Sequence, residues 1–304
     1  MDAKITKQRL ANMLSYDWLK ILLAIVFSVA ALCIFFTTVR TRPTAAQHYT
    51  VYGYTGIYRG KDFGTVDTSL KKGVFSYDIL EVTTESFEGN AYSGAAFSAR
   101  RAAGEGTVLF VSDFDRDGEE GENVSDLHAM VEEFLLDPNT EREKLGLVID
   151  AREYVAEGAE YLKRFFGEDW REGTLDEAEA RACFDARNGK DKRFRFNRDK
   201  YEAGVLNEYA RLEQLRSDYI FVLEAFENGT FGYTEHTTEM GNTYTVGIRV
   251  GNLPKIGNLF YYADANGAQT ATELNLTVLN NGERLGDLKY ETYTFLRYLA
   301  RTYA

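Results

Sequence analysis

Cysteine and proline are both scarce in this chain, which holds two cysteines and three prolines in 304 residues. Because Cys33 falls inside a long apolar run, residues 43–304 contain only Cys183 and can form no internal disulfide. Exported domains of oxidising compartments often carry paired cysteines, so the scarcity favours a bacterial surface where disulfides are little used. We interpret Cys183, within ACFDA, as a small buried residue of a helix. No Pro-rich or Gly/Ser-rich linker follows Pro43, so no domain boundary is marked within residues 43–304.

Local catalytic motifs are absent as well. The chain contains no GxSxG, HExxH or P-loop, and no metal-binding or nucleophile pattern surrounds its three histidines, His48, His128 and His236. Acidic residues number 47, so pairs of carboxylates are too common to mark a site. Triads assembled from distant segments would leave no such pattern. With no pattern in favour of catalysis, we predict a protein that is not an enzyme.

The most informative feature present is an uncharged run, residues 21–39, ILLAIVFSVAALCIFFTTV. As a helix it would span roughly 28 Å, close to the ~30 Å hydrocarbon core of a bilayer. A cleavable signal peptide is the alternative, but its apolar region is usually only about 7–15 residues long. The run is longer and is followed by Arg40 and Arg42, so we predict an uncleaved transmembrane anchor. Cys33 lies too deep in it for a lipoprotein site.

The charges on either side of this run predict its orientation. Lys4, Lys7, Arg9 and Lys20 precede it, whereas only Arg40 and Arg42 follow closely. Lysine and arginine in short flanks stay in the cytoplasm. Residues 1–42 carry a net charge of +4, so residues 43–304 carry −12 − 4 = −16, and the anionic inner leaflet would repel them. We predict a cytoplasmic stub at 1–20, a span at 21–39 and an extracellular domain at 43–304 of a single-pass cell-membrane protein.

The pattern of residues 43–304 predicts an α/β or α+β fold. Residues 74–87 are rich in β-formers, 96–103 favour a helix and 107–111 form a short apolar strand, an order typical of a parallel pair. Residues 126–228 have a helical pattern. A hairpin, further strands and a final amphipathic helix are expected after Gly229, in the segments 230–238 with 242–250, 258–262, 274–279 and 288–303.

One helix in the middle region is especially clear. Apolar residues recur there at intervals of three or four, at Tyr201, Val205, Tyr209, Leu212, Leu215, Tyr219, Leu223 and Phe226. Asn197 is a plausible N-cap, and Asn228 with Gly229 a plausible stop. Such a stripe could dock a partner helix, but an apolar face normally meets its own core. We therefore expect this helix to pack on its own domain.

A possible metal site follows the apolar strand. Asp113, Asp115 and Asp117 alternate before Gly118, which is the first half of a Ca²⁺-binding loop. The second half fails, because Val124 stands where an EF-hand has its bidentate glutamate. A Ca²⁺ site of another type stays open. The alternative is a solvated acidic loop that caps the next helix through Ser125 or Asp126.

A basic cluster lies at residues 190–200, where Phe194 and Phe196 are interleaved with lysine and arginine. Basic residues with aromatics can bind nucleic acid by phosphate contact and base stacking. In a domain of charge −16 the overall field would repel phosphates, so we expect no nucleic-acid partner and ion pairs with the domain's own acidic surface.

Four segments, YDILEVTTESF, ARRAAGEGTVLFVSDFD, NLFYYADANGAQTATELNLTVL and YTFLRYLARTY, look like those of extracellular solute-binding proteins of bacterial ABC importers. The resemblance covers about a third of the chain. It implies a two-lobed α/β fold with a ligand in the cleft between the lobes. The usual member of that family is a longer lipoprotein, whereas this chain has an apolar anchor.

Ligands of α/β proteins lie at the carboxyl ends of strands. This rule makes Thr83, Glu85, Ser112 and Asp113 the candidate cleft residues, with solvated loop or cap positions as their alternative role. We expect a membrane-anchored binding protein for a small ligand, accessory to an ABC transporter. The competing hypothesis is a structural or assembly factor of another membrane complex, with no ligand.

Overall fold

The computed structural model describes the chain as two units, residues 1–42 and residues 43–304. It describes residues 7–39, 43–88, 92–115, 125–133, 145–188, 191, 193–194, 197–238 and 240–304. The first unit is the helix α1, Lys7–Val39, in which the 20 residues Trp18–Thr37 are long and apolar enough to cross a membrane. Their mean hydropathy is 2.7 and none of them is buried, which is consistent with a single-pass anchor.

The second unit is built on a mixed sheet of six strands in the order β3-β1-β4-β9-β6-β5. The strands β1 (His48–Gly53), β3 (Glu81–Ser86) and β4 (Val108–Ser112) are parallel. The others, β5 (Gly232–Thr237), β6 (Thr243–Arg249) and β9 (Leu274–Val278), join antiparallel. A smaller sheet contains β2 (Tyr58–Arg59), β7 (Phe260–Ala263) and β8 (Gln269–Thr270). The fold is therefore mixed α/β.

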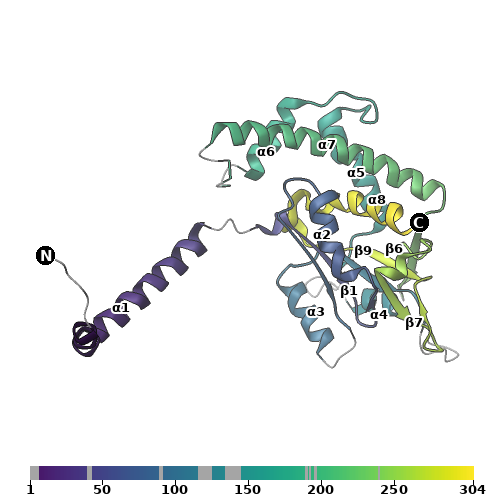
Figure 1. The fold of residues 1–304 in the computed structure, drawn as a ribbon. Coiled ribbons are helices and arrows are strands. Elements are labelled where there is room, and N and C mark those ends of the chain that lie inside the picture. Colours follow the sequence, from purple (N-terminus) through teal and green to yellow (C-terminus); the bar gives the residue numbers. More distant parts are fainter. Residues whose placement is uncertain are drawn as a thin grey trace. The chain divides into compact units, whose positions relative to one another are not determined.

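Helices cover both faces of the large sheet. Successive side chains of a strand point to opposite faces, and apolar side chains on each face pack against helices. On β1, Tyr49 and Val51 pack in the larger core with α2 (Phe63–Gly73), α5 (Ala151–Phe166) and α8 (Glu291–Tyr303). On the other face, Tyr52 packs in a smaller core with α3 (Ser93–Ala102) and α4 (Asp126–Glu133). The helices α6 (Glu177–Asn188) and α7 (Arg198–Glu227) lie outside α8 (Figure 1). Short 3₁₀ helices cover Ala45–Gln47, Ile256–Asn258 and Gly282–Tyr290.

The long helix α7 confirms the expectation drawn from its apolar stripe. Leu212, Leu215 and Tyr219 are buried in the larger core, so the stripe packs on its own domain. The side chain of Asn197 accepts a hydrogen bond from the backbone of Lys200 at 2.9 Å, as an N-cap does. The helix ends at Glu227, before Asn228 and Gly229.

Other expectations are confirmed with shifted boundaries. The hairpin is β5 with β6, the apolar strand is β4, the expected final helix is α8, and Cys183 is buried on α6. The predicted β-rich segment 74–87 is a strand only over Glu81–Ser86. The described residues of the helical region 126–228 form four separate helices, α4 to α7. The strand β1, at the centre of the parallel part, was not predicted. The two-lobed arrangement is not confirmed, because residues 43–304 form one compact unit.

Candidate functional site

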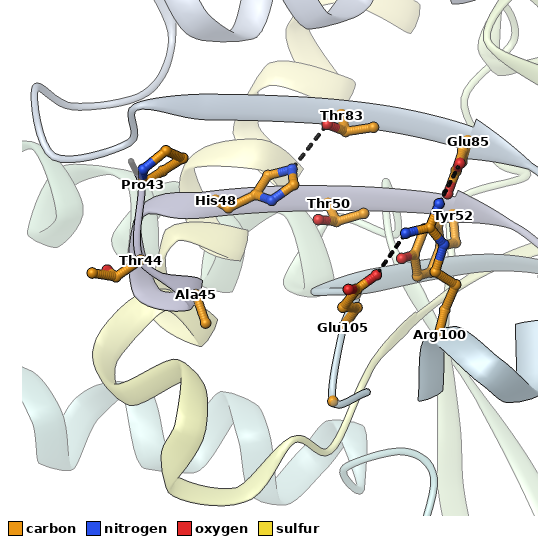
Figure 2. Close-up of a pocket in the computed structure, with 12 residues that line it drawn as sticks. Pro43, Thr44, Ala45, His48, Thr50, Tyr52, Thr83, Glu85, Arg100 and Glu105 are labelled. Carbon is orange, nitrogen blue, oxygen red and sulfur yellow. Dashed lines mark hydrogen bonds and ion pairs between the residues drawn. The ribbon is translucent and has the colours of Figure 1, made fainter. Parts of the chain in front are cut away.

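A pocket of about 370 Å³ lies on the α3 face of the sheet, where β1 and β3 form its floor (Figure 2). One side is made by Pro43 and Ala45, which precede β1. The other is made by Arg100 at the end of α3 and by residues 104–106, which lead into β4. The pocket therefore lies over the face of β1 and β3, from His48 to the level of Tyr52 and Glu85, rather than beyond the carboxyl ends that the strand-end rule indicates.

The floor follows from the register of two parallel strands. Thr50 pairs with Thr83 and Tyr52 pairs with Glu85, so all four side chains project to the same face. One residue earlier on this face, the Nε2 atom of His48 lies 2.8 Å from the Thr83 hydroxyl and forms a hydrogen bond with it. The floor is consequently lined by hydroxyl, imidazole and carboxylate groups.

The charged wall of the pocket is a bridge made by Arg100. Its guanidinium donates to Glu85 at 3.1 Å and to Glu105 at 2.9 Å. The hydrogen bond that Arg100 donates to Glu105 and the charge of Glu85 raise the pKa of Arg100. All three side chains are between a third and a half exposed, so the bridge faces solvent. Two carboxylates and one guanidinium give the lining a net charge of −1.

Two hydroxyls of buried residues open into the pocket without a protein partner among the described residues. Thr50 is 6% exposed and Tyr52 is 1% exposed, yet both line the cavity. Among the described residues, no side chain or backbone group forms a hydrogen bond with either hydroxyl, and Figure 2 draws no contact to them. Burial, together with the charges of Glu85 and Glu105, raises the pKa of Tyr52 to about 12, so this hydroxyl stays protonated at neutral pH. Because each hydroxyl can donate and accept hydrogen bonds, these two are suited to a ligand in the cavity.

The four candidate cleft residues are not brought together. Thr83 and Glu85 line the pocket, although they lie within β3 rather than beyond its end. Ser112 is the last residue of β4, and its buried hydroxyl has no partner in the described part of the chain. Asp113 follows it and contacts α4 instead of the pocket, because its Oδ1 accepts a hydrogen bond from Ser125 at 2.9 Å.

The capping that was the alternative role of this segment is present at Ser125. The Ser125 hydroxyl accepts a hydrogen bond from the backbone of His128 at 3.2 Å, so Ser125 caps α4. Of the three candidate Ca²⁺ ligands, Asp113 is engaged with Ser125, Asp115 belongs to no metal-ligating group among the described residues, and Asp117 lies outside them. No group of three metal-ligating side chains arranged to hold an ion occurs in the described part of the chain.

The structure also brings two histidines together. The rings of His128 on α4 and His236 on β5 lie 4.6 Å apart. His236 contacts Glu132 at 2.6 Å, and the Nε2 atom of His128 lies 3.4 Å from Asp113, without hydrogen-bond geometry. Burial is the main cause that lowers the pKa of His128, and His236 lowers it further, while Asp113 raises it. Because the two histidines are far apart in the sequence, no local pattern predicts that they meet.

In the basic cluster, Arg193 behaves as expected, since its guanidinium pairs with Asp191 at 2.8 Å and with Asp78 at 3.3 Å. Lys190, Lys192, Arg195 and Phe196 lie outside the described residues.

Sequence reasoning missed most of the pocket, namely His48, Thr50, Tyr52, Arg100 and Glu105. The segment HYTVYG alternates polar and apolar residues before a glycine, and this is the signal that could have revealed β1 and its polar face. No protein-family model, curated protein or solved structure was found to match the chain.

Proposed function

We propose that this protein is a membrane-anchored, extracellular binding protein that holds a small polar ligand in the pocket over β1 and β3. The observation that carries the proposal is the pair of hydroxyls of the buried residues Thr50 and Tyr52, which open into a cavity and lack protein partners among the described residues. A small ligand can supply those hydrogen bonds, because each hydroxyl can both donate and accept. A pocket of several hundred Å³ is of the size that small molecules occupy.

The anchor and the charge distribution support the proposed location. The apolar part of α1, Trp18–Thr37, has the length of a bilayer span, and the acidic residues are concentrated after it. In this proposal the stub at 1–20 is cytoplasmic and residues 43–304 are outside the cell, where the pocket meets extracellular solutes. Accessory delivery to an ABC transporter is the role that the resemblance to solute-binding proteins implies. The ligand would then occupy a pocket of one compact unit, and a two-lobed closure would not be required.

A ligand screen with a blocking variant tests the proposal. The full chain in nanodiscs is heated with sugars, amino acids, peptides, amines and Ca²⁺, and its unfolding temperature is recorded. A ligand that binds only the folded state raises this temperature. Thr83→Phe fills the pocket from its floor and should abolish the shift, whereas Thr237→Phe, at an exposed strand position of β5, should preserve it. If Ca²⁺ gives a shift, Asp115→Ala examines whether the acidic loop is its site.

Two results would overturn the proposal. The first is the absence of any shift across the panel. The second is a shift that Thr83→Phe leaves intact, which would place the ligand elsewhere. Co-purification of the chain with a stable membrane complex, without any ligand response, would favour the structural or assembly role instead.

A further inference from the structure

We infer that the ligand of the pocket over β1 and β3 carries an ammonium group, which is held between Glu85 and Glu105. This inference rests on the proposed binding function and narrows it to one chemical class, an organic amine.

The charge of the pocket favours a cation. The charged groups in its lining are Glu85, Glu105 and Arg100, with a net charge of −1, and the surrounding residues 43–304 carry −16. Such a field raises the local concentration of cations and repels anions. A phosphate or carboxylate ligand would also lie beside two carboxylates, and like charges at close range are costly.

The position of Arg100 shows that one cation fits between the two carboxylates. Its guanidinium reaches Glu85 on β3 and Glu105 in the loop after α3, although these belong to different elements (Figure 2). The bridge uses one oxygen of each carboxylate, Glu85 Oε1 and Glu105 Oε2. In the part of the chain that the structure describes, no protein group donates to the other two oxygens. They can accept hydrogen bonds from a second cation, and bonds between charged partners are the stronger kind.

The unpartnered hydroxyls supply the rest of the site. Thr50 pairs in register with Thr83, and Tyr52 with Glu85, so the hydroxyls lie on the same floor as the Glu85 carboxylate. An ammonium has three N–H donors and no acceptor. A hydroxyl oxygen can accept one of these donors, and the hydroxyl hydrogen can serve a polar group elsewhere on the ligand. The lining therefore offers carboxylates for the charge and hydroxyls for the remaining hydrogen bonds.

An organic amine could come from two sources, a free solute or a lipid headgroup. The ammonium chemistry is the same in both cases.

The test measures ethanolamine binding by calorimetry, with the full chain in nanodiscs of phosphatidylglycerol. Glu85→Gln combined with Glu105→Gln should weaken binding by at least about tenfold, the loss expected for hydrogen bonds to a charged group. Glu81→Gln makes the same charge change on the same strand, outside the pocket, and should alter affinity by less than about twofold. Nanodiscs that contain phosphatidylethanolamine separate the sources, because a bound headgroup lowers the apparent affinity for ethanolamine and a free-amine site is unaffected.

Arg100→Gln tests the same inference independently, because it should increase the affinity for ethanolamine instead of lowering it. Removing the protein's own cation frees both carboxylates, so ethanolamine should bind about three- to tenfold tighter, the worth of two exposed ion pairs. Damage to the fold would weaken binding instead.

The outcomes separate this inference from the proposed function. Unchanged ethanolamine affinity in the double glutamine variant would overturn the ammonium assignment. If glucose binds and Thr83→Phe blocks it while ethanolamine does not bind, the ammonium inference fails and the binding function stands. If no compound binds, both fail.

Discussion

His128 and His236 are in contact, with their ring centroids 4.6 Å apart and their planes tilted by 44°, and thereby join α4 to β5. Asp113 and Glu132 are the carboxylates beside them. Burial lowers the pKa of His128, and the second imidazole acts in the same direction. The protein therefore holds a histidine pair that favours the neutral form of His128.

This arrangement predicts a loss of stability on acidification. Between the lowered pKa of folded His128 and the unfolded value of about 6.5, the unfolded chain binds more protons, so stability rises with pH in that window. The contribution of His128 to stability is fully present above pH ~6.5 and falls as the pH decreases. His128→Gln should flatten this part of the profile. Urea unfolding of the full chain in nanodiscs between pH 5 and 8, followed by tryptophan fluorescence, measures it. Parallel profiles for the two proteins would refute the assignment.

A buried ion cluster predicts a large effect of one arginine. Arg211 is 2% exposed and donates to Glu291 at 2.8 Å and to Glu208 at 2.9 Å. Arg211→Met would leave two buried carboxylates without this partner, so the free energy of unfolding should fall by about 3–5 kcal/mol. Arg164→Met breaks a half-exposed pair with Glu179 and should cost under about 1 kcal/mol. Similar losses in the two variants, measured by urea unfolding, would contradict this account.

Close packing around Gly158 predicts that an alanine there destabilises the protein, whereas an alanine at the open position Gly64 does not. A Cβ atom there would lie 2.5 Å from the hydroxyl of Tyr293 and 2.6 Å from the ring of Tyr219. Both tyrosines are buried, so Gly158→Ala should destabilise the protein by about 1–3 kcal/mol. Gly64→Ala on α2 meets no atom within 4 Å and should be neutral or slightly stabilising. Thermal unfolding compares the two, and an equal response would show that α5 can move away from these rings.

The sequence predicted those elements whose signals are local. The stripe and the cap at Asn197 specify α7 by the period of a helix and by one side-chain hydrogen bond. Ser125 likewise caps α4, which is the alternative to a Ca²⁺ site that the sequence indicated for this segment. The hairpin of β5 and β6 was also visible, because its two alternating segments are adjacent in the chain.

The pocket could not be predicted in the same way, because it depends on register between distant segments. Thr50 meets Thr83 only when β1 and β3 pair in parallel across α2, and Arg100 reaches Glu85 from a third element. The strand-end rule indicates Thr83 and Glu85, yet the pocket that contains them lies over the face of β1 and β3 and not beyond the strand ends. Ser112 and Asp113 do not line the pocket, and the spacing of residues in the sequence does not predict this.

The central claim is that a small ligand occupies the pocket over β1 and β3. Its most direct test is nuclear magnetic resonance of the full chain in nanodiscs with labelled threonine methyl groups, titrated with ethanolamine, glucose and amino acids. We predict that at least one compound shifts the signals of Thr50 and Thr83, which line the pocket, while those of Thr230 and Thr237 stay in place. Shifts confined to threonines outside the pocket, or no shift with any compound, would contradict the claim.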